Sequence, residues 1–425
     1  MKIRINKKTW LLSFIIVFLP VALALEMNYQ TPFVGYADEI FSLIMLVHLC
    51  RLAMYRKLEK SDAAMLLILM VFTMIGMLSN LYSKLMTNLA LIALDAFWQW
   101  KIFLGYMGAK YLMRYDRRGL TLRGLRPVAK LLILSACVFG VLSFRFDLGM
   151  TDSIRYGLPE FRFVFGNQGR YGIIVAVSLL IVLATEPRPK RRKLYILVAI
   201  ADMIFSTKGV VYVIIPIFLM LWFIFEKIEK TGEIKTWIVV LVVIVGVLVS
   251  SFQITTYLLD ASAPRALLIR YGFVTANTYF PFGSGFGTYG SEIAAQYYSP
   301  LYMEYGWADK WMMGLKNGNA LNDNHMATII GESGYFGLVL FLMLFWIMFR
   351  QINQVRMTSQ VKALTMSLFI CMMICFLATG IAKSSIGVMV FIALGVMVRE
   401  YERRAWMAEK QNAPAGDTGA KIKLQ

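Results

Sequence analysis

Histidine, cysteine and charged residues are scarce in this chain. Only two histidines and four cysteines occur among 425 residues, without an H-x-x-x-H or C-x-x-C pair, which argues against a structural or catalytic zinc site. The cysteines lie in apolar stretches without the spacing of a disulfide framework, as expected for small buried or lipid-facing side chains. We therefore expect no metal held by protein ligands and no cofactor.

Apolar residues are abundant instead. They make up 59% of the chain, charged residues only 16%, and the mean hydropathy is +0.63, which is too apolar for a soluble protein. We predict an all-α integral membrane protein with about twelve spans, each near the length that crosses ~30 Å of hydrocarbon. The predicted spans are residues 10–27, 33–55, 63–83, 89–113, 127–145, 171–185, 193–207, 209–226, 236–258, 325–349, 363–381 and 384–399.

The spans divide the chain into four parts. Residues 1–258 hold helices one to nine with an outer loop at 146–170, residues 259–324 form a large outer loop with short helices, and residues 325–400 hold the last three helices. The polar tail, 401–425, is expected to be cytoplasmic and disordered. The N-terminal stretch "MKIRINKKTW" leads into the first span without a small-residue cleavage site, so we expect that span to be retained.

Basic residues cluster in every second connection and at both ends of the chain. Examples are Arg51 to Lys60, Arg114 to Arg126 and Arg188 to Lys193. By the positive-inside rule these connections and both termini are cytoplasmic. Membrane orientation thus accounts for most of the +19 charge, and no nucleic-acid partner is expected. Charges within spans, such as Asp95 and Lys101, are expected to pair between helices.

Two long segments, 146–170 and 259–324, fall on the outer side, where we expect the function. The second is rich in glycine and aromatics, which stack on sugar rings or lie at the membrane interface; composition leaves both open. Guanidinium groups suit a multiply charged anion such as a lipid-linked diphosphate. The alternatives are anchoring to lipid headgroups or pairing with Asp152, Glu160 or Asp260. The outer cationic candidates are Arg162, Arg170, Arg265, Arg270 and Lys208.

A polar stripe follows the outer loop into the tenth span. In "NDNHMATIIGESGYFG" (322–337), Asn322 and Asp323 are good helix starters. His325, Thr328 and Glu332 fall on one helical face by their three- and four-residue steps. His325 is therefore either a general base or an interfacial histidine.

Four motifs together give the chain a family resemblance: "FGNQGRYG" (165–172), "STKGVV" (206–211), "PRALL" leading to "PFGSGFGTYGS" (264–291), and "NDNHMATIIGESGYFGL" (322–338). With them, the chain resembles the bacterial O-antigen ligase and O-antigen or capsular polysaccharide polymerase superfamily. The resemblance implies a GT-C-like fold in the bacterial inner membrane, with an active site on the extracytoplasmic face. Counted from the glycine motif, Asp323 occupies the position of the ligase histidine, and Lys208 replaces a family arginine. These departures favour a repeat-unit polymerase.

The resemblance implies inverting, metal-independent glycosyl transfer from undecaprenyl diphosphate to a sugar hydroxyl. A diphosphate leaves without protonation once its charge is neutralised, so one base suffices. A lipid-linked donor and acceptor, a flippase and a chain-length regulator are the expected partners. Two alternatives stay open: a ligase that attaches finished polymer to lipid A core, and a transporter or flippase. The predicted catalytic residues are Asp323, His325 and Arg265; the predicted substrate-binding residues are Arg270, Arg170, Arg162, Lys208, Asn322, Asn324, Asn167 and Tyr289.

Overall fold

The computed structural model describes residues 7–29, 35–116, 118–155, 157–231, 263–380 and 383–412. Most of them are helical, and every predicted span except 236–258, which lies outside the described residues, overlaps a helix. The helices are α1 (Lys7–Tyr29), α3 (Ala37–Met54), α4 (Lys60–Ser83), α5 (Leu89–Met113), α6 (Leu120–Leu142), α7 (Gln168–Thr185), α8 (Pro189–Phe205), α9 (Gly209–Thr231), α11 (Pro264–Thr278), α12 (Glu292–Gln296), α13 (Pro300–Glu304), α14 (His325–Gln354), α15 (Ser359–Ala378) and α16 (Ser385–Asn412).

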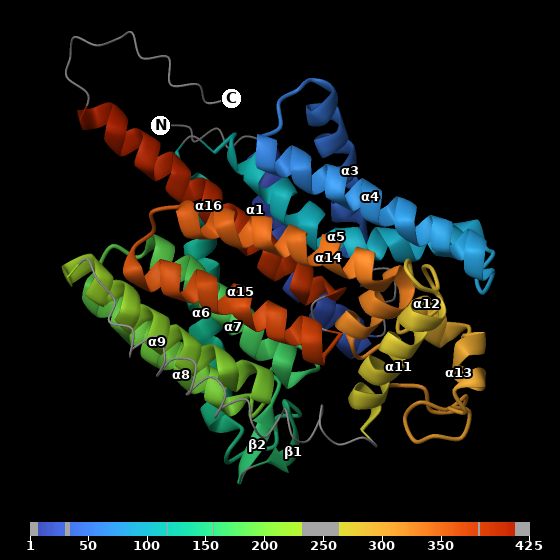
Figure 1. Ribbon diagram of the computed structural model, residues 1–425. Helices are drawn as coiled ribbons and strands as arrows, with labels where there is room; N and C mark the ends of the chain where they lie inside the picture. Colours follow the sequence, from blue (N-terminus) through green and yellow to red (C-terminus); the bar gives the residue numbers. More distant parts are fainter. Residues whose placement is uncertain are drawn as a thin grey trace.

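Six of the described helices are long and apolar enough to cross a membrane: α4, α6, α7, α9, α14 and α15. The chain is thus a helical membrane protein. α7 is almost entirely buried, and the second half of α5 packs along the buried first half of α16. These three helices form the centre of the bundle, and the others surround them (Figure 1).

One segment, which the sequence predicted to be a loop, forms the two short strands of an otherwise helical protein. Residues 151–161 form an antiparallel hairpin of β1 (Thr151–Arg155) and β2 (Leu158–Phe161), with Gly157 at φ 77° in its turn. Only glycine adopts such an angle without strain. The hairpin and the helices α11 to α13 lie away from the C-terminal half of α16 (Figure 1).

Basic connections that are distant in the sequence meet at one end of the bundle. Arg114 donates to Glu59 at 2.6 Å, and Arg399 of α16 lies 3.7 Å from the same carboxylate. Arg404 donates to the carbonyl oxygen of Ala184, at the end of α7, at 2.9 Å. The basic clusters at 51–60, 114–126 and 399–404 and the end of α7 therefore meet at one end of the bundle.

Two lysines inside the bundle are paired with carboxylates of neighbouring helices, as predicted for charges within spans. The Lys101 ammonium of α5 lies 2.6 Å from Asp38 and 2.5 Å from Glu39, both in the first turn of α3. Lys110, nine residues after Lys101 on α5, lies 3.0 Å from Asp62 of α4. Such pairs avoid the cost of a lone charge in an apolar surrounding.

Candidate functional site

A glycine-rich loop, residues 281–291, packs deeply between α4, α5 and α14. Four of its glycines have positive φ angles, and a Cβ at Gly283 would lie 2.6 Å from the Gly331 carbonyl oxygen. A Cβ at Gly285 would lie 2.6 Å from the backbone nitrogen of Asn80. The motif "FGSGFGTYGS" is therefore required for close backbone approach as well as for turning.

α14 is broken where this loop meets it. Gly334 has φ 62° and ψ −162°, so the helical hydrogen-bond ladder opens there. The carbonyls of Gly331 and Glu332 accept instead from the backbone nitrogens of Ser284 (2.9 Å) and Gly285 (2.8 Å). Loop and helix thus satisfy each other's buried backbone groups.

Two buried carboxyl groups hold the same loop. Glu332 Oε1 accepts from the backbone nitrogens of Thr288 (3.0 Å) and Tyr289 (3.1 Å), and Asp95 Oδ2 accepts from that of Gly287 (3.1 Å). The side chains of Glu332 and Asp95 also act on each other electrostatically. The sequence placed Glu332 on a polar stripe and expected Asp95 to pair between helices, but it did not reveal that they meet.

An arginine–aspartate pair lies at the start of α14. Arg265, in the first turn of α11, donates from Nε (2.8 Å) and Nη2 (2.6 Å) to Oδ2 of Asp323. The Arg265 and Asp323 side chains are 23% and 34% exposed, so substrate can reach them. The next residue, Asn324, is buried and caps α14 by accepting from the backbone nitrogen of Ala327 at 3.0 Å. That cap fixes the backbone beside Asp323.

A polar pocket of about 590 Å³ is lined by Asn322, the residue that precedes Asp323 in the chain. Its lining includes Glu292 and Gln296 of α12, Tyr297, Asn319 and Asn322. The Asn322 amide donates to the Glu292 carboxylate, which ties the residue beside Asp323 to α12. Carboxylate, amide and aromatic groups in one open pocket suit a saccharide, since they offer acceptors, donors and a stacking surface.

Lys383 is a cation that the sequence did not connect with this site. It lies in the turn between α15 and α16, and a Cβ at Gly380 of that turn would lie 3.1 Å from the Asn322 carbonyl oxygen. Burial lowers the pKa of Lys383, and the surrounding carboxylates oppose that shift. The carboxylates that act on it are Asp95, Glu292, Glu332 and Asp323.

His325 faces the bundle rather than the pocket. It is 1% exposed, its Nε2 lies 2.5 Å from Gln99 Oε1, and its ring packs edge-on against Phe341 and Phe376. Thr328, one turn on, donates to the Gly290 carbonyl oxygen at 2.6 Å. The polar residues of the predicted stripe thus bind other groups of the protein and do not face the pocket.

Tyr289 belongs to a small hydrophobic core formed by residues between Leu267 and Ala327. Its ring packs against Tyr302, Tyr305 and Trp307, and its hydroxyl donates to the carbonyl oxygen of Leu268 at 2.6 Å. Burial raises the pKa of Tyr289 well above its usual value, so the hydroxyl stays protonated and keeps donating. The structure gives Tyr289 a packing role.

The remaining predicted cationic residues lie on other elements. Arg162 pairs with Asp152 of β1 at 3.2 Å. Pairing with this aspartate was one of the alternatives to anion binding that the sequence left open. Arg170 interacts electrostatically with Glu26 of α1, and Lys208 stands just before α9. Arg270 is exposed and lies five residues after Arg265, so the two do not share a helical face.

Asn167, predicted to bind substrate, caps α7. Its Oδ1 accepts from the backbone nitrogens of Gly169 (2.9 Å) and Arg170 (3.3 Å). Of the predicted residues, the structure thus brings together Arg265, Asp323 and Asn322, with Asn324 as their support. It adds Glu292 and Lys383, which the sequence did not single out for this site.

No known protein family and no curated protein matches this chain. The functional argument therefore rests on the geometry and on the motifs of the sequence.

Proposed function

We propose that this protein polymerises lipid-linked saccharide repeat units. It would transfer a glycan from undecaprenyl diphosphate to a sugar hydroxyl of a second lipid-linked unit, with inversion and without a metal. The observation that carries the proposal is the partly exposed Arg265–Asp323 pair, whose aspartate follows Asn322 of the polar pocket in the chain. The family resemblance of the sequence supports the same chemistry.

Asp323 is the base in this proposal. Both hydrogen bonds that Arg265 donates to Asp323 end on Oδ2, and in this proposal the other carboxylate oxygen, Oδ1, takes the proton of the acceptor hydroxyl. The hydroxyl oxygen then attacks the anomeric carbon, whose bond to the diphosphate oxygen breaks on the opposite side. General-base assistance of this kind is typically worth 10² to 10⁴ in rate, by order of magnitude.

Cationic side chains stabilise the leaving group. Arg265 pairs with Asp323, and Lys383 interacts electrostatically with the same carboxylate; in this proposal both cations neutralise the charge that develops on the diphosphate. Glu292 and Asn322 hold the acceptor sugar in the polar pocket. Asn322 is the residue directly before the base, Asp323. One carboxylate base and two cations are enough, because a diphosphate needs no general acid.

The proposed location is the bacterial inner membrane, with the site on the extracytoplasmic face. The convergence of the basic connections at one end of the bundle supports this orientation. The arginine–aspartate pair and the polar pocket belong to residues 264–323, on the outer side in this scheme.

The test is growth of a polymer ladder in vitro. Purified protein in lipid nanodiscs receives lipid-linked repeat units alone, and products are separated by size. We expect a ladder from the native chain and none from Arg265→Ala, while Lys310→Ala, a change of an exposed cation in the same domain, keeps the ladder. A requirement for lipid A core would overturn the polymerase in favour of a ligase; translocation of the lipid without glycan transfer would favour a flippase.

A further inference from the structure

α11 runs alongside the first turns of α14 and in the same direction. At its start, Arg265 pairs with Asp323, which stands just before α14. Near its end, Asn277 Oδ1 accepts a hydrogen bond from the Tyr335 hydroxyl of α14 at 2.7 Å. The two contacts follow the same order along both helices, and the helices pack side by side (Figure 1). The end of α11 therefore lies beside Tyr335.

The break at Gly334 divides α14 into a segment beside α11 and a segment long enough to cross a membrane. Residues 335–354 are about twenty residues, roughly 30 Å of helix, which matches the thickness of the hydrocarbon core. The exposed residues Phe336, Val339 and Trp346 of this segment share one helical face and are apolar, as expected for a lipid-facing surface. The break therefore lies at one edge of the hydrocarbon.

Exposed phenylalanines continue the lipid-facing surface of α14 onto α11 and the residues after it. The rings of Phe282 and Phe336 lie 5.8 Å apart, centroid to centroid. Phe273 and Phe280 each lie 6.4 Å from the Tyr335 ring. All four phenylalanines are between 39% and 65% exposed, and we call them the phenylalanine patch. Because the patch is continuous with a lipid-facing helix, lipid is the occupant that the fold provides for it.

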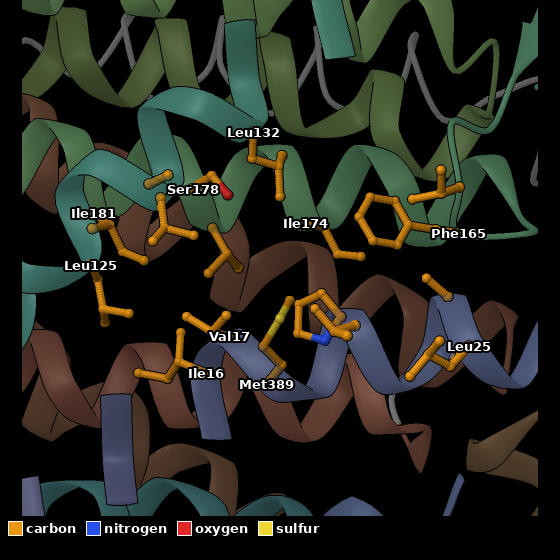
Figure 2. Close-up of a pocket in the computed structure, with 17 residues that line it drawn as sticks. Ile16, Val17, Leu25, Leu125, Leu132, Phe165, Ile174, Ser178, Ile181 and Met389 are labelled. Carbon is orange, nitrogen blue, oxygen red and sulfur yellow. The ribbon is translucent and has the colours of Figure 1, made fainter. Parts of the chain in front are cut away.

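The phenylalanine patch differs in composition from the apolar surface around α1, α6 and α7. A cavity of about 450 Å³ between those three helices is lined mainly by aliphatic side chains (Figure 2). Phe165 is the only aromatic residue that the structure describes in its lining. Aliphatic side chains suit the hydrocarbon core, whereas aromatic side chains next to a basic residue are typical of segments at the membrane–water interface.

Arg270 provides that basic residue. It is exposed and shares one face of α11 with Phe273, Val274 and Asn277, at steps of three, four and seven residues. Seven residues correspond to roughly 10 Å along α11 from Asn277, which lies beside Tyr335. The head-group region is roughly 5–8 Å thick on each side of a bilayer. Arg270 therefore lies at the outer limit of that region, where its long, flexible side chain reaches lipid phosphate.

We infer that the second half of α11 is a membrane-contact surface for anionic phospholipid. The phenylalanine patch lies among the upper acyl chains, and Arg270 binds the head group. Anchoring to head groups was one of the alternatives that the sequence left open for the arginines. Arg265 projects from another face of α11 and stays with Asp323. The membrane thereby fixes the depth and direction of the helix whose first turn carries Arg265.

Photo-crosslinking at two depths tests this assignment. The native full-length chain is placed in nanodiscs of phosphatidylglycerol and phosphatidylcholine that contain a phosphatidylglycerol with a diazirine. The diazirine stands either near the head-group end of the acyl chain or at its methyl end, and adducts are mapped by mass spectrometry. We expect the shallow probe to label residues 273–282 and the deep probe to label residues 339–346 but not 273–282.

Two results would overturn the inference. If neither probe labels residues 273–282, the phenylalanine patch does not contact lipid and is left to a partner protein. If the deep probe labels residues 273–282 as strongly as residues 339–346, the end of α11 lies in the hydrocarbon core and not at the interface.

Matched variants test the role of Arg270. The shallow phosphatidylglycerol probe should label residues 273–282 about fivefold more than a phosphatidylcholine probe of the same design, because one basic residue near an anionic surface is worth ~1 kcal/mol. Arg270→Gln should remove this preference, whereas Lys316→Gln, a change of an exposed cation between α13 and α14, should retain it. An unchanged preference in Arg270→Gln would contradict the head-group contact. Labelling needs no glycan transfer, so expected labels without any polymer would contradict the proposed function alone.

Discussion

Asp323 and His325 are two residues apart, yet the start of α14 separates their surroundings. Asp323 precedes the helix, is 34% exposed and is held by Arg265. His325 is the first residue of the helix and is enclosed by Gln99 and two phenylalanines. A base must reach the proton that it abstracts. The sequence left the choice between them open, and these contacts favour Asp323 as the base in our proposal.

Glu332 is the residue for which we predict the clearest stability effect. Glu332→Ala leaves the backbone nitrogens of Thr288 and Tyr289 without their acceptor, and each unsatisfied buried group costs about 1–3 kcal/mol. Glu332→Gln keeps an acceptor oxygen and should cost less than about 1 kcal/mol. Thermal unfolding of the purified variants in detergent measures the difference. Equal melting temperatures for the two variants would show that Glu332 does not hold the loop.

At the scale of elements, the motifs that carry the family resemblance are mainly a packing unit. "FGSGFGTYGS" and "GESGYFG" meet through backbone hydrogen bonds at the break of α14. Their glycines are required by close approach, which explains their spacing. The chemistry we propose lies beside this unit, at Arg265 and Asp323, and depends on it for position.

A single methyl group tests this packing unit. Gly334→Ala places a Cβ 2.4 Å from the Pro281 carbonyl oxygen, at backbone angles that only glycine adopts readily, and should destabilise the fold by at least about 2 kcal/mol. The matched control is Gly124→Ala on α6, where nothing lies within 4 Å of the added Cβ. Helix propensity predicts that this control is neutral or stabilises by up to ~1 kcal/mol. Equal unfolding temperatures would contradict the account of the break.

The sequence predicted the helices well because each needs a long apolar run, and such runs are visible in one dimension. It missed the hairpin at 151–161, whose strands are short and whose pairing depends on a turn. It also missed the break at Gly334 and the meeting of Asp95 with Glu332, since both depend on contacts between distant segments. Asn167 and Tyr289 have side chains that could bind a substrate. In the structure, however, Asn167 caps α7 and Tyr289 packs in a buried core.

At the scale of the whole molecule, the shared basic end predicts the orientation in the membrane. In intact cells, a membrane-impermeant maleimide should label Asp309→Cys, in the outer domain, and should label Arg191→Cys only after permeabilisation. Both positions are exposed, and the native chain gives the background from its own cysteines. The reverse pattern would place the arginine–aspartate pair on the cytoplasmic side and contradict the proposed location.

The central claim is that one carboxylate, Asp323, activates the acceptor. The most direct measurement is the rate of ladder growth by Asp323→Asn compared with Asp309→Asn, which makes the same change at an exposed position of the same domain. We predict that Asp323→Asn lowers the turnover rate by roughly 10²-fold or more while its unfolding temperature stays that of the native chain, and that Asp309→Asn matches the native chain in both. Turnover by Asp323→Asn within about twofold of the native rate, a barrier change under ~0.5 kcal/mol, would contradict the account.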